Sequence, residues 1–321
     1  MTAFSGRKQL RTVGGEGSSS SSSLSINSSD NVLMNLRLVE SAKKALGGGL
    51  AGACAMVVQV LLLMWLRTTM NYQYARSGVS TFAAIRILYA NGGIGRFYRG
   101  LIPALIEAPL AKFGDIAANS GVLSYFSDGR LSLRSKTFLA SIIASIWRAL
   151  IMPVDTLKTT LQVKGAKGME FLAEQVLSVG PSSLYNGALG AAFSCLVGHF
   201  PWFLMFNYLS DVFKDENRHR PGWRRHAKRA AVGFAASVFS DTISNGFRVL
   251  KTIKQTSSGT LSYWDAFETA VSTEGAIGFW TRGLGTRLIC NGLGAMLFTV
   301  VWKSLEEAYF LRGAGRVKRP A

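Results

Sequence analysis

The chain has 321 residues, 48% of them hydrophobic, and its 36 Lys and Arg against 18 Asp and Glu give a formal net charge of +18. Disordered proteins have a low apolar content, and a typical nucleic-acid-binding domain carries its basic residues on a water-soluble body with more charged residues than the 17% found here. The composition therefore disfavours both classes and directs the search to membrane proteins and repeat proteins.

Residues 1–38 form a Ser-rich segment that is predicted to be a disordered tail. Its early basic residues, Arg7, Lys8 and Arg11, loosely resemble an organellar presequence, whereas Glu16 and the serine run suit a plain disordered tail equally well. The segment lacks the apolar core that a secretory signal needs.

Six apolar stretches follow, and they predict membrane-spanning helices. A helix of about 20 residues crosses a hydrocarbon core of ~30 Å, and the uncharged stretch 45–66 has this length. Stretch 187–210 is the second strong candidate, while the other four are short or contain charged residues, which are costly in lipid and should face a polar interior. A soluble all-α protein with buried helices is the alternative. The predicted spans are 45–66, 101–126, 135–154, 187–210, 230–247 and 288–302.

The sequence aligns on itself in three copies. The first, third and fifth spans end in similar short segments that begin with Arg67, Lys158 and Lys251, which stand 91 and 93 positions apart. Each copy continues with a polar stretch and then a glycine motif that opens the next span.

One pair of helices cannot bury its interior side alone, so this period predicts a closed ring. The predicted fold is an all-α membrane protein of six transmembrane helices in a pseudo-threefold bundle, with short surface helices between odd and even spans. The predicted repeats are 39–128, 129–216 and 217–310, followed by a basic tail at 311–321.

The third span ends in Pro153-Val154-Asp155-Thr156-Leu157-Lys158, with Gln162 four residues further on. A Pro-x-Asp-x-x-Lys pattern in register with three repeats resembles the signature of the mitochondrial carrier family. The resemblance covers residues 40–310, which is nearly the whole chain apart from its tails. It implies an inner-membrane transporter with one central site that opens alternately to the matrix and to the cytoplasm.

The resemblance also implies a matrix-side gate, in which acids and bases of neighbouring repeats pair. Only Asp155 supplies an acid at the aligned positions, because Met64 and Arg248 stand in the other two repeats. In the family's order Asp155 pairs with Lys251, Lys158 has no acidic partner and Arg248 confronts Arg67. The remaining cations either hold anions or extend to lipid head groups. The expected matrix gate consists of Arg67, Pro153, Asp155, Lys158, Gln162, Arg248, Lys251 and Gln255.

The family's aromatic, acid and base pattern near the cytoplasmic ends of the even helices is degenerate here. In the last repeat the order of the two charges is reversed, at Lys303 and Glu306. A gate on this side should therefore depend more on hydrogen bonds than on ion pairs. Its candidate residues are Asn119, Asn207, Asp211, Lys303 and Glu306.

Polar residues midway along the spans are the candidate substrate contacts, because charged groups at that depth are functional by default. Arg148 and Asp241 occupy equivalent positions, and they either pair across the cavity or bind a zwitterion. His199 either couples proton movement or caps a hydrogen bond near Pro201, and with Asn291 it stands where the family presents a base. The candidates are Glu107, Lys112, Asp115, Arg148, Ser194, Cys195, His199, Asp241 and Asn291.

Enzymatic chemistry is not expected from this sequence. The histidines and cysteines lack metal-ligand spacing, the glycine-rich segments lack a phosphate-loop pattern, and no catalytic triad can be nominated, so neither a metal site nor a cofactor is expected. Cys54, Cys195 and Cys290 lie in apolar stretches, which predicts reduced thiols rather than a disulfide framework.

We therefore expect transport of a small, charged metabolite by a monomeric, multi-pass protein of the mitochondrial inner membrane, with the chloroplast envelope and the peroxisome as alternative locations. The functional alternative is a carrier-like adaptor or scaffold that no longer transports. The basic loop 214–229 and the basic tail suit anionic lipid head groups such as cardiolipin. Nucleic-acid or lipid binding by that loop is a third hypothesis, although a nucleic-acid partner is not expected.

Overall fold

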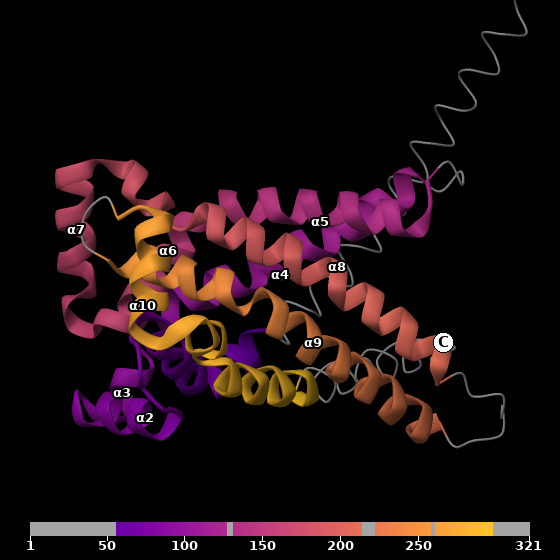
Figure 1. Cartoon of the computed structure of the whole chain (residues 1–321), viewed down its shortest axis with the longest axis horizontal. Coiled ribbons are helices and arrows are strands. Elements are labelled where there is room, and N and C mark those ends of the chain that lie inside the picture. The colour runs from indigo at the N-terminus through magenta and orange to yellow at the C-terminus, as the bar shows by residue number, and fades with distance from the viewer. Residues whose placement is uncertain (1–55, 127–130, 214–221, 258–260, 298–321) are drawn as a thin grey trace, which may run out of the picture. The chain divides into compact units, whose positions relative to one another are not determined.

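The structure, a computed structural model, describes residues 56–126, 131–213, 222–257 and 261–297 (Figure 1). The chain divides into the units Met1–Lys43 and Lys44–Ala321, and the first lies wholly outside the described residues. The predicted tails at both ends and residues 214–221 of the predicted basic loop also lie outside them, whereas residues 222–229, expected in that loop, are helical. The described part contains helices and turns but no strand, which confirms the predicted all-α class.

The helices correspond to the predicted spans and to the segments between them. Residues 56–75 and 284–297 are helical, and they flank a series of long and short helices. The long helices are α4 (Leu101–Tyr125), α5 (Leu133–Leu150), α8 (Ala188–Val212) and α9 (Gly222–Thr256). The shorter elements are α2 (Thr81–Ala90), α3 (Gly93–Phe97), α6 (Met152–Lys164), η1 (Gly165–Lys167), α7 (Gly168–Val179), η2 (Pro181–Tyr185) and α10 (Tyr263–Thr281).

Length and hydropathy alone identify fewer spans than the repeat pattern predicts. Among the described residues, the helical stretch Pro181–Val212 is long and apolar enough to cross a membrane. A second span is obtained if Leu133–Leu150 and Met152–Val179, which are bent by 64°, are counted together. The number six therefore remains a prediction from the repeat.

Two predicted stretches need correction at their ends. Stretch 135–154 was expected to run through Pro153, but α5 ends at Leu150 and α6 begins at Met152. Proline is tolerated in the first turn of a helix, where its missing N–H has no intrahelical partner, so Pro153 begins a new helix at the bend. The last stretch was expected to begin at 288 without a charge, yet the helix starts at 284 and includes Arg287.

Serine residues mark where several helices begin. Ser80, Ser132 and Ser262 precede α2, α5 and α10, and each side-chain hydroxyl accepts a hydrogen bond from a backbone N–H of the first turn. These caps satisfy donors that a helix start leaves unpaired. The start of α5, which is a predicted span, is thus fixed by its own capping serine. The same holds for α10, which lies between two predicted spans.

The long helices pack against one another side by side. Helix α8 lies along α9 and α5, and α4 lies along α5 (Figure 1). Helix α9 also contacts α10 and α6. Polar side chains from these helices are thereby directed into shared interior space.

The three glycines that open the even spans all have positive φ and lie close to the odd helix of the next repeat. A Cβ on Gly100 would lie 3.0 Å from the backbone oxygen of Lys158, and one on Gly187 would lie 2.9 Å from that of Lys251. A Cβ on Gly283 would lie 2.8 Å from the ring of Tyr74 in the first repeat. The contacts thus run from the first repeat to the second, from the second to the third and from the third to the first.

Replacing Gly187 by alanine should lower the unfolding temperature of the purified protein. The φ of +92° and the close Lys251 carbonyl both oppose a Cβ, and we expect a loss of about 2 kcal/mol or more. Gly78→Ala is the matched control, because Gly78 also has a positive φ but has no atom within 4 Å of its Cβ position. Equal losses in the two variants would show that backbone conformation alone requires glycine at 187.

Candidate substrate cavity

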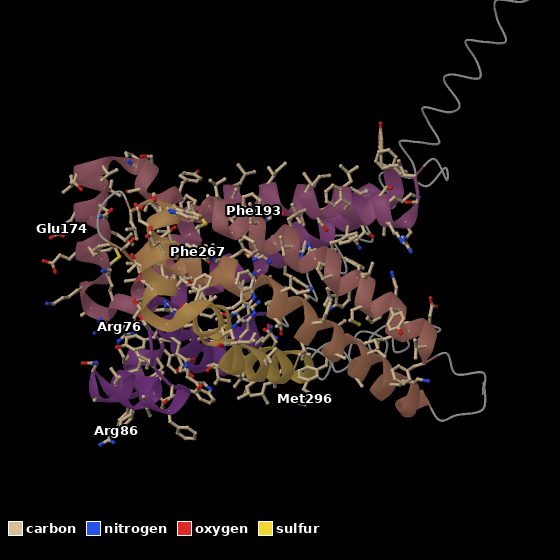
Figure 2. All side chains as sticks on the ribbon, in the orientation of Figure 1. Arg76, Arg86, Glu174, Phe193, Phe267 and Met296 are labelled. Atoms are coloured by element: carbon tan, nitrogen blue, oxygen red, sulfur yellow. The ribbon has the colours of Figure 1, made fainter. Side chains whose placement is uncertain are left out.

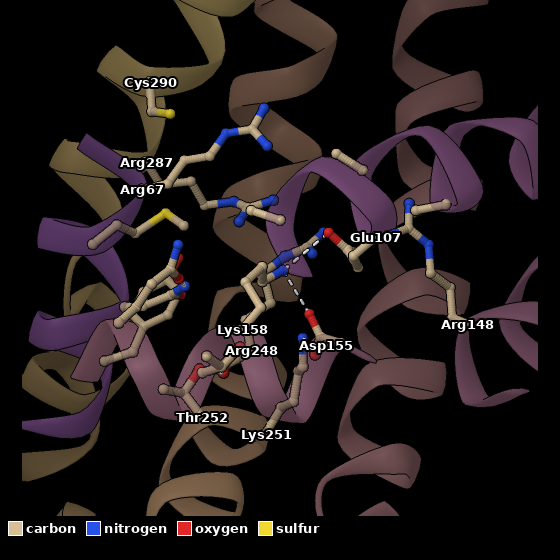
Figure 3. A pocket seen from close by; sticks show the side chains of 18 of the residues that line it. Arg67, Glu107, Arg148, Asp155, Lys158, Arg248, Lys251, Thr252, Arg287 and Cys290 are labelled. Atoms are coloured by element: carbon tan, nitrogen blue, oxygen red, sulfur yellow. Dashed lines mark hydrogen bonds and ion pairs between the residues drawn. The ribbon is translucent and has the colours of Figure 1, made fainter. Parts of the chain in front are cut away.

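A cavity of about 240 Å³ lies among helix 56–75, α4, α5, α6, α9 and helix 284–297 (Figure 3). Helix α8 contributes no lining residue among those described. Seven of the lining side chains are basic and three are acidic, so the cavity carries an excess of positive charge. The basic residues are Arg67, Lys112, Arg148, Lys158, Arg248, Lys251 and Arg287, and the acidic ones are Glu107, Asp115 and Asp155.

Asp155 is the centre of a charged cluster on the cavity wall. Its carboxylate lies 2.7 Å from Lys158 Nζ and 2.5 Å from Lys251 Nζ, and Gln255 Nε2 donates a hydrogen bond to its Oδ2 at 2.9 Å. Figure 3 shows these basic groups gathered around the carboxylate. The predicted Asp155–Lys251 ion pair is present, and it joins the second predicted repeat to the third.

The expectation that Lys158 lacks a partner is wrong. Its ammonium group lies 3.0 Å from Glu107 Oε2 as well as contacting Asp155. Glu107 belongs to α4, so a long lysine side chain reaches an acid on the even helix of the first repeat. Met64, which occupies the aligned acid position, contacts instead Gln162 Nε2 at 3.4 Å.

The remaining candidate gate residues have partners of their own. Arg67 donates to Gln59 Oε1 at 3.0 Å, and Arg248 lies 3.9 Å from Asp241. Both arginines line the cavity. Gln162 accepts a hydrogen bond from Asn71 Nδ2 at 2.5 Å, so a neutral contact joins the first and second repeats in addition to the Lys158–Glu107 ion pair.

Arg148 and Asp241 do not pair with each other, contrary to one of the two alternatives. Arg148 contacts Asp115 at 2.8 Å and Glu107 at 3.6 Å, both on α4. Asp241 accepts hydrogen bonds from Arg287 Nε at 2.8 Å and from Asn291 Nδ2. Each group on an odd helix is thus neutralised by the adjacent even helix.

Arg287 is the residue that the sequence argument missed. The uncharged stretch 288–302 begins one residue after Arg287, so the sequence pattern predicts Asn291 as the substrate contact on the sixth helix and leaves the arginine out. Residues four apart share one helix face, and the described helix places both side chains on Asp241. Counting back one turn from Asn291 would have identified the arginine.

The three candidates on α8 do not line the cavity. Cys195 packs with Ala118 and Ala144, and its sulfur lies 3.9 Å from the ring nitrogens of His199. The Ser194 hydroxyl donates to Ala191 O, one turn back on its own helix. The hydropathy of a helix that is apolar on nearly all sides does not show which of its faces points toward the cavity. In the structure these residues contact α4 and α5 or the backbone of α8, and they do not line the cavity. Cys290 is the cysteine on the cavity wall.

Ligand atoms of Asp115, Cys195 and His199 lie within 4.8 Å of one another, a set that could hold a metal ion and that sequence spacing did not reveal. Arg148 already binds the Asp115 carboxylate at 2.8 Å. A divalent cation would have to compete with this guanidinium, so the charge around the set favours the thiol and imidazole as packing and hydrogen-bonding groups.

The cytoplasmic candidates are only partly described. Asn119 is half-buried on α4, and Asn207 and Asp211 are exposed on α8. Lys303 and Glu306 lie outside the described residues. Their grouping as a gate therefore stays a prediction.

Comparison with protein families matches residues 38–130 and 222–312 to the family described as mitochondrial carrier protein. The two ranges together cover more than half of the 321 residues. They correspond to the first and third predicted repeats, whereas the charged cluster around Asp155 lies in the second. The comparison with curated proteins found no match.

Exchanging the charges of Asp155 and Lys251 tests whether their contact matters for activity. The single variants Asp155→Lys and Lys251→Asp each leave like charges facing one another, so each should abolish solute exchange in reconstituted vesicles. The double variant should recover part of it, because an opposite-charge pair is restored. A double variant no more active than either single variant would contradict a functional pairing.

Proposed function

The chain belongs to the mitochondrial carrier family, and we propose that it moves a small anionic metabolite across the mitochondrial inner membrane by alternating access through the cavity described above. Members of this family are membrane transporters of solutes and not enzymes, so solute transport in general follows from membership. The observation that supports an anionic substrate is the excess of basic side chains on the cavity wall.

The acids of the cavity leave its positive charge only partly neutralised. Glu107, Asp115 and Asp155 are each in contact with a basic side chain. The Nε atoms of Arg148 and Arg248 are buried and have no hydrogen-bond partner. A buried unpaired donor is costly, and carboxylate or phosphate oxygens of a bound substrate would accept from such groups and would balance the charge.

The contacts between repeats support a pseudo-threefold arrangement of six helices. The cyclic series of glycine contacts, from Gly100 to α6, from Gly187 to α9 and from Gly283 to helix 56–75, is what a closed ring of three equivalent units requires. The carbonyl three residues before each of these glycines accepts a side-chain hydrogen bond from the odd helix of its own unit: Thr68 donates to Phe97 O, Thr156 to Leu184 O and Asn245 to Trp280 O. Repeats at 39–128, 129–216 and 217–310 fit this pattern.

The charged cluster is the proposed gate on the matrix side. Its Asp155–Lys251 contact joins two repeats across the bundle, and alternating access would require that contact to break. An ion pair at this distance is worth about 1–4 kcal/mol before desolvation in a partly polar site. A substrate anion that draws Lys158 or Lys251 toward itself would lower the cost of opening.

We also propose that the protein works as a monomer and that it contacts anionic lipids such as cardiolipin. The basic loop and the basic tail supply the positive charge for contact with these lipid head groups. Within the described residues no feature favours the carrier-like scaffold over a transporter.

A screen of metabolite classes against the purified protein tests the proposal. Ligands of the native state raise its apparent stability, so one class of carboxylate or phosphate anions should raise the unfolding temperature and exchange across reconstituted vesicles. Arg287→Gln and Lys112→Gln should each weaken binding of that anion about tenfold, which corresponds to about 1.4 kcal/mol. Arg86→Gln, at an exposed position on α2, is the control of equal charge change. Stabilisation by cationic metabolites alone would contradict an anionic substrate.

A further inference from the structure

Glu107 of α4 contacts two cations that belong to different parts of the site. Its Oε2 atom lies 3.0 Å from Nζ of Lys158, which is part of the charged cluster around Asp155. Its Oε1 atom lies 3.6 Å from Nη1 of Arg148 on the cavity wall. Figure 3 shows Glu107 with Lys158 on one side and Arg148 on the other. One carboxylate is thus divided between a residue of the proposed gate and a candidate substrate contact.

The carboxylate of Glu107 depends on these cations because it has little access to water. The residue is 7% exposed, and a buried charge is tolerated only where its partners replace the water that it loses. If Lys158 withdraws, the carboxylate must either bind Arg148 more closely or keep an uncompensated charge. The first outcome costs less.

The two contacts of Glu107 are unequal in the structure. Lys158 donates a hydrogen bond to it at 3.0 Å, whereas the 3.6 Å contact with Arg148 is an ion pair beyond hydrogen-bond distance. Arg148 instead donates to Asp115 at 2.8 Å, and its buried Nε atom has no hydrogen-bond partner. While Lys158 occupies Glu107, Arg148 therefore keeps donor capacity for a substrate anion.

The chain bends between Arg148 and Lys158. Arg148 lies on α5, Lys158 lies on α6, and the two helices meet at Ile151. The bent pair to which they belong, Leu133–Leu150 with Met152–Val179, has an angle of 64°. A change in this bend would move Lys158 away from α4 while the Asp115 contact keeps Arg148 beside it.

We propose that Glu107 lowers the affinity of the cavity for its anion when the gate opens toward the matrix. Opening withdraws Lys158, so the carboxylate closes on Arg148 and competes with the anion for the guanidinium. Under the proposed function, on which this inference rests, the anion is bound while the gate is closed and released once it opens. Glu107 acts through Arg148 and is thus a positioning residue.

Asp115 supplies a matched comparison on the same helix. It lies eight positions, or about two turns, further along α4 than Glu107, and it contacts the same arginine at 2.8 Å. Among the ion pairs of the described residues, none joins Asp115 to Lys158. Its competition for Arg148 should therefore be the same whether the gate is closed or open.

The test measures affinity separately from the cytoplasmic and the matrix side, with the full-length protein reconstituted in vesicles in one orientation. The probes are inorganic phosphate, malonate, citrate and ADP. For the probe that is transported, Glu107→Gln should raise the matrix-side affinity about tenfold and the cytoplasmic-side affinity much less. Asp115→Asn should raise both affinities by the same factor. Glu174→Gln, which removes the same charge from an exposed position on α7 (Figure 2), should change neither.

Equal effects of Glu107→Gln on the two sides, or a one-sided effect of Asp115→Asn, would overturn the role of Glu107 and leave the proposed function standing. Transport of none of the probes by the unmodified protein would refute the proposed function and the role of Glu107 with it. Lys158→Gln serves if Glu107→Gln does not fold. Glu107 then closes on Arg148 in both states, so the cytoplasmic-side affinity should fall about tenfold and the matrix-side affinity much less. An unchanged cytoplasmic-side affinity in that variant would also overturn the role of Glu107.

Discussion

The buried carboxylate of Asp155 is the group on which the arrangement of the described helices most depends. It is 5% exposed and is held by Lys158 of its own helix, by Lys251 of α9 and by Gln255 one turn beyond Lys251. A buried charge is tolerated only when its partners replace the water that it loses. The first turn of α6 and the last turns of α9 must therefore stay in contact for as long as this carboxylate is ionised and shielded from water.

The same requirement explains why, within the described residues, length and hydropathy identify only one or two helices able to span a membrane. Arg148, Asp241 and Arg287 lie within long helices and lower their hydropathy. Each of them contacts an oppositely charged side chain from another helix. Charge inside these helices is thus compatible with a bundle whose interior is polar and whose outer face is apolar.

The resemblance to the carrier family, carried onto the aligned positions of the three repeats, implied the contact between Asp155 and Lys251, which the structure contains. It could not predict the contact of Lys158 with Glu107, which depends on how far a long side chain reaches across to α4. The assignment of Cys195 and His199 to the cavity failed for another reason. Helix α8 is apolar on all sides, so its sequence does not indicate which face is turned inward.

One acid in place of three makes the three interfaces of the proposed ring unequal. The interface between the first and second repeats has the Lys158–Glu107 ion pair, and the one between the second and third has the Asp155–Lys251 ion pair. The third and first repeats are joined by a neutral hydrogen bond, with Tyr74 donating to Asn245. Separating an ion pair costs more than separating a neutral hydrogen bond. The ring would then open in a preferred order, with the interface between the third and first repeats ahead of the two that hold ion pairs, so the transport cycle of this carrier would be asymmetric even though its fold is built from equivalent units.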